Sequence, residues 1–241
     1  RRMLLHMKAI TEGARVLAYE TALHVDIANR HPDPKVREES KDWVDLNTPL
    51  HKAFCTDQGV ELGSMAVQVY GGHGYIKEHG IEQIVRDAKI CCLYEGTNGI
   101  QAMDLVRRKL MLHNGRLTQR FFAAVRKDLG GANSFIAKPL ALALDELLKT
   151  TQWLQDSYKT SPDDAAFGCA DFLRAFSLTY LGWNWLRMVR AAAMVGDTAM
   201  HASKRATAEY FATRILSQVP ALCANVRQPA GLLMQLDATH F

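Results

Sequence analysis

Apolar residues recur at helical spacing along almost the whole chain, and this periodicity limits the possible folds more than any other feature. In the opening segment, Leu4, Ile10, Ala14 and Leu17 fall on one face of a helix, which we predict to run from the start of the chain to about Asn29. No segment alternates apolar and polar residues between hairpin turns, as half-buried strands do. The sequence therefore predicts an all-α protein: an up-down helical bundle followed by a second helical bundle.

Proline and dense charge mark the end of this first helix. The stretch NRHPDPKVREES contains two prolines and many charged side chains, so it predicts a solvated connection. Thr48 is then a candidate N-cap, and Pro49 suits the first position of a helix, where its missing N–H costs nothing. We expect the second helix to begin at these residues and to extend to about Tyr70.

Two glycine-containing breaks divide the segment that follows. The stretch GGHGY ends the second helix, because glycine permits positive φ and close approach of the backbone. The stretch GIEQIVRDAKICCL predicts a short third helix, and apolar spacing after the next break predicts a fourth helix to about Leu112. These helices define a first domain, residues 1–112.

After a boundary at HNGRL, residues 113–241 form a C-terminal helical extension in this interpretation. Its predicted helices are separated by stop-and-cap sequences and cover about 117–128, 138–158, 163–194 and 199–226. The third of these is so rich in aromatic and apolar residues that it can bury more than one face. A packed core explains this composition better than a cofactor site does, although Trp183 and Trp185 also suit a subunit contact.

Composition argues against several classes of function. The net charge of +4 is modest and no block of Lys or Arg stands out, so we expect no nucleic-acid partner. No apolar run approaches the roughly 20 residues that span a bilayer, so we expect no transmembrane segment. The five cysteines form no CxxC pair and the histidines show no HExxH spacing. This pattern predicts a reduced, cytoplasmic protein without a metal site.

Three short motifs in the first domain have side chains suited to chemistry: QVYGGHGY (68–75), VRDAKI (85–90) and YEGTNGIQ (94–101). In the last motif, Glu95 stands in a glycine-containing break before a helix. Local chemistry allows it to be a solvated loop carboxylate or a base directed into a pocket, where burial and the helix end would tune its pKa. Thr97 is placed either to cap that helix or to bind a ligand.

The glycine-rich turn of QVYGGHGY also has two interpretations. It is either a plain helix C-cap or a place where a phosphate or another subunit approaches the backbone. It is not a P-loop, because no strand precedes it and no GK[ST] follows.

Taken together and in this order, the three motifs closely resemble the C-terminal α-helical domain of the acyl-CoA dehydrogenases. That family shows Q-x-x-G-G-x-G-[YF], then R-D-A-K, then [YG]-E-G-T-x-x-I-Q, and this chain matches all three without an insertion between Gln68 and Glu95. The resemblance covers roughly residues 1–112. The sequence EGTNG and the long extension indicate a subfamily that includes the methylmercaptopropionyl-CoA dehydrogenases.

The resemblance implies an FAD-dependent oxidation of an acyl-CoA to a trans-2-enoyl-CoA. Glu95 matches the family's base, which takes the α-proton while the β-hydrogen leaves as hydride to FAD. Tyr94 would line the acyl pocket, and Thr97 matches a residue near the flavin. Gln68 and Gly72 match positions that touch the FAD of a neighbouring subunit, which implies a homo-oligomer, a dimer or a tetramer. The family also implies an electron-transferring flavoprotein as the electron acceptor.

The match has departures and leaves other positions in lesser roles. Gly99 stands where the family commonly has a Glu or Gln that contacts FAD in some members, so that contact is not carried over. Arg86 and Asp87 match the family's R-D pair, and we expect an ion pair that fixes the segment leading to the base. Lys89 matches as well, and we expect it to be solvated.

The family's N-terminal and β domains are missing from the sequence, which also begins in the middle of a helical pattern. We therefore expect a portion of a longer or multi-chain enzyme, inactive by itself. The alternative is a non-catalytic helical interaction or oligomerisation module that retains the family fold. A third, weaker interpretation is an acyl-CoA oxidase-like relative that passes electrons to oxygen.

Overall fold

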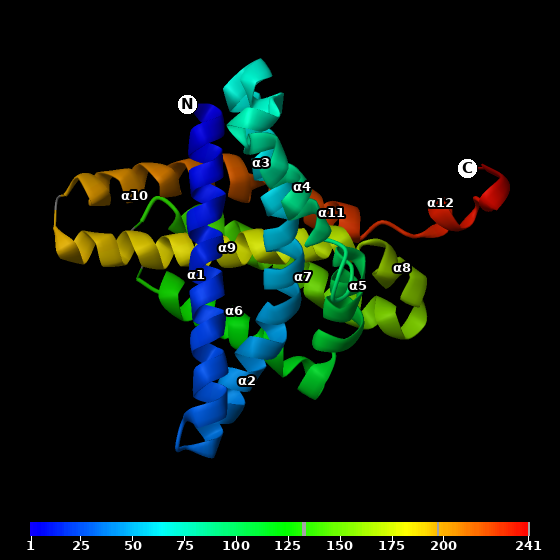
Figure 1. Ribbon diagram of the computed structural model, residues 1–241. Helices are drawn as coiled ribbons and strands as arrows, with labels where there is room; N and C mark the ends of the chain where they lie inside the picture. Colours follow the sequence, from blue (N-terminus) through cyan, green and yellow to red (C-terminus); the bar gives the residue numbers. More distant parts are fainter. Residues whose placement is uncertain (132–133, 197, 241) are drawn as a thin grey trace.

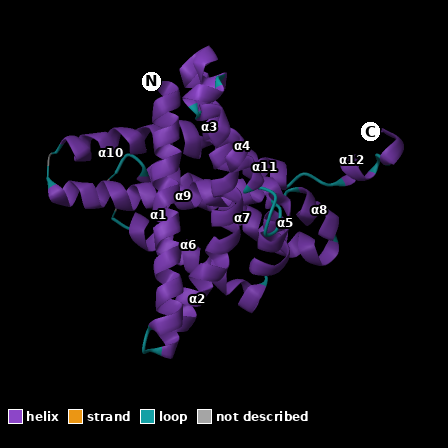
Figure 2. Cartoon of the chain, viewed as in Figure 1, coloured by secondary structure: helices purple, strands orange, loops and turns teal. Residues whose placement is uncertain are grey.

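The computed structural model describes residues 1–131, 134–196 and 198–240, and all regular structure in this part of the chain is helical (Figure 2). The predicted all-α class is therefore confirmed. Two long helical rods dominate residues 1–112 and lie side by side, as Figure 1 shows. One rod is α1 (Arg2–Arg30), close to the predicted bounds, and the other is a composite of several segments.

The second rod begins earlier than the sequence predicted. Helix α2 (Pro34–Pro49) continues through a π turn (Leu50–Phe54) into α3 (Cys55–Tyr70) without a break. The start predicted at Thr48 and Pro49 is wrong. The Asp33 side chain caps α2 by accepting from the Lys35 N–H at 2.9 Å, so the helix begins with the same cap-and-proline pattern one segment earlier.

The dense charge that suggested a solvated connection has a different origin. Glu38 and Glu39 of that stretch lie in α2 and pair with Arg116 and Arg120 of α6 (Arg116–Leu129) at 2.8 and 3.6 Å. The buried Asp42, one turn later, accepts hydrogen bonds from both arginines. The charges on this face of α2 therefore join it to the extension. Thr48 does not cap a helix, since its Oγ1 donates to the Val44 carbonyl at 2.7 Å within α2.

The glycine-rich turn ends α3 as predicted. Gly71 has φ +63°, and a 3-10 turn covers Gly71–Tyr75. Helix α4 (Ile81–Ile90) then returns along α3, with Val85 packed against Gly63. The fourth predicted helix is present as α5 (Asn98–Asp104), followed by a π turn at Leu105–Lys109.

The extension places helix α9 at the centre of the molecule (Figure 1). The remaining helices, in chain order, are α7 (Ala137–Thr160), α8 (Pro162–Phe167), α9 (Cys169–Val195), α10 (Ala199–Tyr210), α11 (Val219–Val226) and α12 (Gly231–Met234). Two predicted helices are interrupted. The segment 163–194 breaks at Gly168, where a Cβ would lie 2.7 Å from the Val226 Cα. In 199–226, a π turn at Phe211–Ile215 and a 3-10 turn at Leu216–Gln218 separate α10 from α11.

One cluster of buried side chains joins the two segments of the chain. It contains Leu17 from α1, Leu46 from α2 and Phe121 from α6, packed with Tyr180 and Trp185 of α9. The predicted aromatic core is thus confirmed. Trp183 also lies in this core, so both tryptophans take part in internal packing. No helix in the described residues has the length and apolar character needed to cross a membrane.

Candidate functional site

Glu95 lies in the loop between α4 and α5, in an unusual backbone conformation. Its φ is +53°, and the following Gly96 has φ +85°, so two successive residues occupy the left-handed region. Glu95 is exposed, and within the described residues its carboxylate has no hydrogen-bond or ion-pair partner. A non-glycine residue at positive φ is strained, and an unpaired carboxylate in such a turn is available for chemistry.

Polar contacts attach the loop to the second rod, at the π turn between α2 and α3. Lys52 of the π turn donates from Nζ to the Gly96 carbonyl at 2.6 Å and to the Asn98 Oδ1 at 2.8 Å. Asn98 in turn donates from Nδ2 to the Ala53 carbonyl at 3.2 Å and to Asp57 Oδ1 at 2.7 Å. Sequence reasoning missed both Lys52 and Asn98. The only signal was the place of Asn98 inside the YEGTNGIQ motif.

Thr97 caps α5, which is one of its two predicted roles. Its Oγ1 accepts from the Ile100 N–H at 3.3 Å, while its own hydroxyl proton stays available for a ligand. Gln101 reaches back from α5 and donates from Nε2 to the Glu95 carbonyl at 3.3 Å. The helix start and the loop before it are therefore held as one unit.

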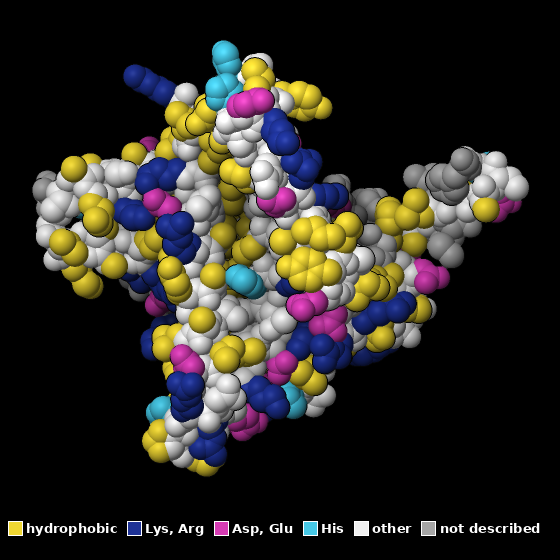
Figure 3. All heavy atoms as spheres, in the orientation of Figure 1, with side chains coloured by type: hydrophobic (Ala, Val, Ile, Leu, Met, Phe, Trp, Pro, Cys, Tyr) yellow, Lys and Arg dark blue, Asp and Glu magenta, His cyan; other side chains and the backbone are white. Residues whose placement is uncertain are grey.

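Tyr94 belongs to an apolar surface beside Glu95. Its ring is 50% exposed, and its hydroxyl donates to the Cys91 sulfur at 3.7 Å. This hydrogen bond and the nearby Cys91 raise the pKa of Tyr94. Ile90, Leu93 and Ile100 are also more than half exposed, and Figure 3 shows hydrophobic side chains gathered over this part of the molecule. Apolar residues exposed in this density are typical of surfaces that contact another molecule or domain.

Gln68 and Gly72 lie elsewhere, at the far end of α3. Both are exposed, and a Cβ added at Gly72 would meet no atom within 4 Å. Gln68 is about 16 residues beyond Lys52 on one continuous helical rod, which separates the two positions by about 24 Å at the α-helical rise. The structure therefore places the predicted base and the predicted cofactor-binding pair at opposite ends of α3.

The expected ion pair between Arg86 and Asp87 does not form. Arg86 instead pairs with Glu82, one turn earlier on α4, at 2.8 Å. On a helix, residues four apart face each other, whereas adjacent residues point in different directions. The same pair lines a cavity of ≈ 390 Å³ between α3 and α4, together with Ser64, Val67, Tyr75 and Val85.

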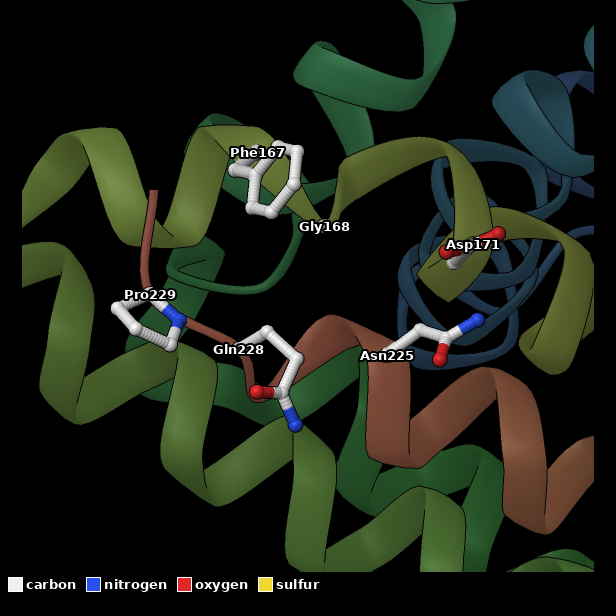
Figure 4. A pocket seen from close by; sticks show the side chains of 6 residues that line it. All are labelled: Phe167, Gly168, Asp171, Asn225, Gln228 and Pro229. Carbon is white, nitrogen blue, oxygen red and sulfur yellow. The ribbon is translucent and has the colours of Figure 1, made fainter. Parts of the chain in front are cut away.

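A second cavity lies in the extension, far along the chain from the predicted site residues. It measures ≈ 490 Å³ and is lined by Phe167, Gly168, Asp171, Asn225, Gln228 and Pro229, as Figure 4 shows. None of the residues predicted from the sequence lines it. The described residues contain no group of three His, Cys, Asp or Glu side chains that could hold a metal ion.

Comparison with known proteins identifies the family. A family model described as "Acyl-CoA dehydrogenase, C-terminal domain" matches residues 1–110, and one described as "Acetyl-CoA dehydrogenase C-terminal like" matches residues 119–237. The 3-methylmercaptopropionyl-CoA dehydrogenase of Ruegeria pomeroyi is 39% identical over 97% of this chain and 41% of that protein. The chain belongs to the acyl-CoA dehydrogenase family. It corresponds to the family's C-terminal, helical part.

Other acyl-CoA dehydrogenases show the same relation. A butyryl-CoA dehydrogenase of Syntrophomonas wolfei is 31% identical over 94% of this chain and 39% of that protein. Among solved structures, an acyl-CoA dehydrogenase complexed with FAD from Bacillus anthracis matches with a TM-score of 0.73 and 18% identity, covering 99% of this chain and 42% of that one. The chain spans about two fifths of the length of the curated relatives it matches.

A second solved structure has a similar helical fold. Caenorhabditis elegans ACDH-11 in complex with C11-CoA matches with a TM-score of 0.69 and 21% identity, over 88% of this chain and 35% of that one. At these identities the two structures establish the shared helical fold.

Proposed function

We propose that this chain is the C-terminal portion of an FAD-dependent acyl-CoA dehydrogenase that converts an acyl-CoA to a trans-2-enoyl-CoA. The observation that carries the proposal is Glu95: an unpaired carboxylate in a loop fixed by Lys52, Asn98 and Gln101. Names among the relatives supply two test substrates, 3-methylmercaptopropionyl-CoA and butyryl-CoA. The proposal includes a cytoplasmic location and an electron-transferring flavoprotein as the acceptor.

In this proposal Glu95 takes the α-proton of the thioester and holds it on its carboxylate. The electron pair of the broken C–H bond moves toward the β-carbon and forms the double bond as the β-hydrogen departs with its own pair. FAD, when bound, supplies the acceptor for that hydride. Tyr94 and the apolar residues around it suit the lining of an acyl pocket, because they bring apolar surface to the base and exclude water when covered.

The residues present fit a flavin. Thr97 keeps a hydroxyl proton free beside Glu95. Gln68 has an exposed amide that can donate and accept, and the open space at Gly72 lets a bulky group approach the backbone. Gln68 and Gly72 lie about 24 Å along α3 from the Glu95 end. This separation supports their assignment to the FAD of a neighbouring subunit, and so a homo-oligomer.

The test is Glu95→Gln in the intact protein. We expect the variant to keep its yellow FAD and its affinity for acyl-CoA, and to lose flavin bleaching by substrate by roughly 10²–10⁴-fold, the contribution of a general base. Glu209→Gln, which changes an exposed carboxylate on α10, is the matched control and should bleach like wild type. Full bleaching in Glu95→Gln would overturn the assignment of the base.

The alternative function is a non-catalytic helical interaction or oligomerisation module. The exposed apolar residues of the first domain, among them Tyr75 at 82% exposure and Tyr19 at 70%, favour it as well. This alternative would be supported if the intact protein assembles but retains no FAD and binds neither of the two acyl-CoA test substrates. If the flavin bleaches, reoxidation by air compared with reoxidation by electron-transferring flavoprotein separates an oxidase-like enzyme from a dehydrogenase.

A further inference from the structure

The turn that carries Glu95 cannot hold its shape alone. Glu95 and Gly96 both have positive φ. For glycine this conformation is free of steric cost, whereas for glutamate it is disfavoured and persists only where the surroundings impose it. The loop is also exposed and packs few apolar side chains. Polar contacts must therefore determine the direction in which the Glu95 side chain leaves the backbone.

Both carbonyls of the turn are held from outside it. The Glu95 carbonyl accepts from Gln101 at 3.3 Å, and the Gly96 carbonyl accepts from Lys52 at 2.6 Å. The contact at Gly96 is the shorter of the two, and its donor is charged, which makes it the stronger hydrogen bond. It also comes from a different element, the π turn between α2 and α3, so it ties the loop to the rod.

Lys52 is bound in an unusual way for a lysine. Lys52 is half-buried, and its ammonium donates to two neutral acceptors, the Gly96 carbonyl and the Asn98 side chain. It has no ion pair within the described residues. A lysine recruited for surface charge normally stays solvated or faces a carboxylate. The ammonium of Lys52 therefore serves to hold this turn, through the Gly96 carbonyl and Asn98.

Asn98 completes the attachment from the other side. Its Oδ1 accepts from Lys52, and its Nδ2 donates to the Ala53 carbonyl, the Thr56 hydroxyl and Asp57. The Asn98 N–H also donates to the Cys92 carbonyl at 3.1 Å, which closes the loop on itself. One cation and one amide therefore fix the turn to the rod at Gly96 and Asn98.

We propose that Lys52 is a positioning residue for Glu95: its ammonium, clamped on the Gly96 carbonyl and Asn98, sets where the base stands over the substrate. This inference rests on the proposed function, because it assigns Lys52 a part in the same reaction. Lys52 acts through the turn and does not itself touch the substrate. A displacement of about 1 Å at a reacting group can cost about 100-fold in rate.

The experiment uses the intact flavoprotein and the more effective of the two acyl-CoA substrates. Three variants are compared with wild type. Lys52→Met removes the charge and both hydrogen bonds, whereas Lys52→Arg keeps the charge and the capacity to donate. Lys41→Met removes an exposed lysine on α2 and is the control. Stopped-flow reduction of the flavin gives a rate constant, an amplitude and a substrate affinity. Amide hydrogen exchange of residues 93–98 reports on the turn independently of activity.

For Lys52→Met we expect the rate constant to fall about 100-fold while the substrate affinity changes less than about threefold. Lys52→Arg should recover most of the rate, and Lys41→Met should match wild type. Partial unfolding lowers the amplitude and leaves the rate constant of the remaining enzyme unchanged, so a merely structural role gives a different result. Exchange at residues 93–98 should accelerate in Lys52→Met.

Failure of the two proposals gives separate outcomes. An unchanged rate constant and unchanged exchange in Lys52→Met overturn the positioning role. If wild type itself shows no flavin reduction, the proposed function fails, and faster exchange in Lys52→Met still supports the clamp. If Lys52→Met does not fold, Asn98→Ala, which removes the side-chain partner of Lys52, must show the same slower reduction and faster exchange, and wild-type values in that variant overturn the role.

Discussion

Helices α9 and α4 differ widely in how far they are buried. From Phe172 to Leu186, α9 is buried on nearly every face, whereas α4, which leads into the Glu95 loop, has no fully buried residue. Burial of apolar area supplies most of the stability of a fold. The extension therefore supplies much of the buried core, while the predicted base lies in the loop that follows an exposed helical hairpin, α3–α4.

Polar groups connect the exposed region to this core. Tyr180 of α9 accepts from Asn47 of α2 at 3.2 Å and donates to Glu20 of α1 at 3.1 Å. Burial raises the pKa of Tyr180 well above its usual value, so this hydroxyl stays protonated and serves as a link. The first domain thus rests on α9 through both apolar packing and directed hydrogen bonds.

The largest effect should come from truncating a tryptophan of α9. Trp185 is fully buried and donates from Nε1 to the Ala9 carbonyl on α1 at 3.1 Å. Trp185→Ala should lower the free energy of unfolding by about 3–5 kcal/mol, since it leaves a cavity and removes the hydrogen bond to the Ala9 carbonyl. Urea denaturation of the purified protein measures this change.

The matched variant on α4 is Ile84→Ala, at a side chain that is 53% exposed. We expect it to change the free energy of unfolding by less than about 0.5 kcal/mol. Equal losses in the two variants would contradict the contrast between the two helices and would show that α4 is buried against another part of the intact protein.

An effect of intermediate size on the free energy of unfolding should distinguish Gly168 from Gly72. A Cβ at Gly168 would lie 2.7 Å from the Val226 Cα and 2.8 Å from its carbonyl oxygen, so Gly168→Ala should cost about 1–3 kcal/mol through forced backbone movement. At Gly72 a Cβ meets nothing within 4 Å, and Gly72→Ala should leave the denaturation midpoint unchanged.

Retention of FAD tests the predicted contact between Gly72 and the flavin. If Gly72 faces a flavin of a neighbouring subunit, Gly72→Ala should release FAD more readily during gel filtration, with folding intact. Gly71→Ala is unsuitable as a control because of its positive φ, whereas Gly231→Ala, at another open position, should retain FAD like wild type. Equal retention in all three proteins removes Gly72 from the predicted flavin contacts.

Local periodicity was enough to predict most of the helices. The spacing of Leu4, Ile10 and Leu17 predicted α1 closely, and the glycines of GGHGY predicted the end of α3. The error at Pro49 arose because two cap-and-proline pairs, Asp33–Pro34 and Thr48–Pro49, stand close together in the sequence. Only tertiary contacts distinguish them. Asp42 and its arginine partners, about 75 residues away, hold α2 in helical form.

The site was predicted less completely for a similar reason. The ordered motifs led to Glu95, Tyr94 and Thr97 through resemblance. The roles of Glu95 as the base and of Tyr94 in lining the acyl pocket stay predictions. Lys52, however, contacts Gly96 from 44 residues earlier in the chain. Such a contact leaves no trace in local spacing, because it depends on how α4 returns along α3.

The smallest effect should come from an ion-pair link between the two regions, and it carries a pH signature. Glu12 of α1 accepts from Lys204 of α10 at 2.8 Å and also from Lys8. Burial raises the pKa of Glu12, but the hydrogen bonds from the two lysines outweigh it and hold this pKa below its ordinary value of 4.5. Since folding lowers the pKa, the ionised carboxylate stabilises the fold at pH above the unfolded value, and this contribution disappears as the pH falls through the folded value.

Glu12→Gln should therefore lower the free energy of unfolding by about 1 kcal/mol or less at pH 7, as expected for a partly exposed pair. The difference from wild type should shrink below the ordinary pKa of 4.5 and vanish in stronger acid. Urea denaturation across this pH range measures the difference. The control is Glu209→Gln, an exposed carboxylate on α10, the helix that carries Lys204. A difference that persists undiminished in acid would mean that Glu12 joins the regions by packing, and the contrast between a polar link here and an apolar one at Trp185 would fail.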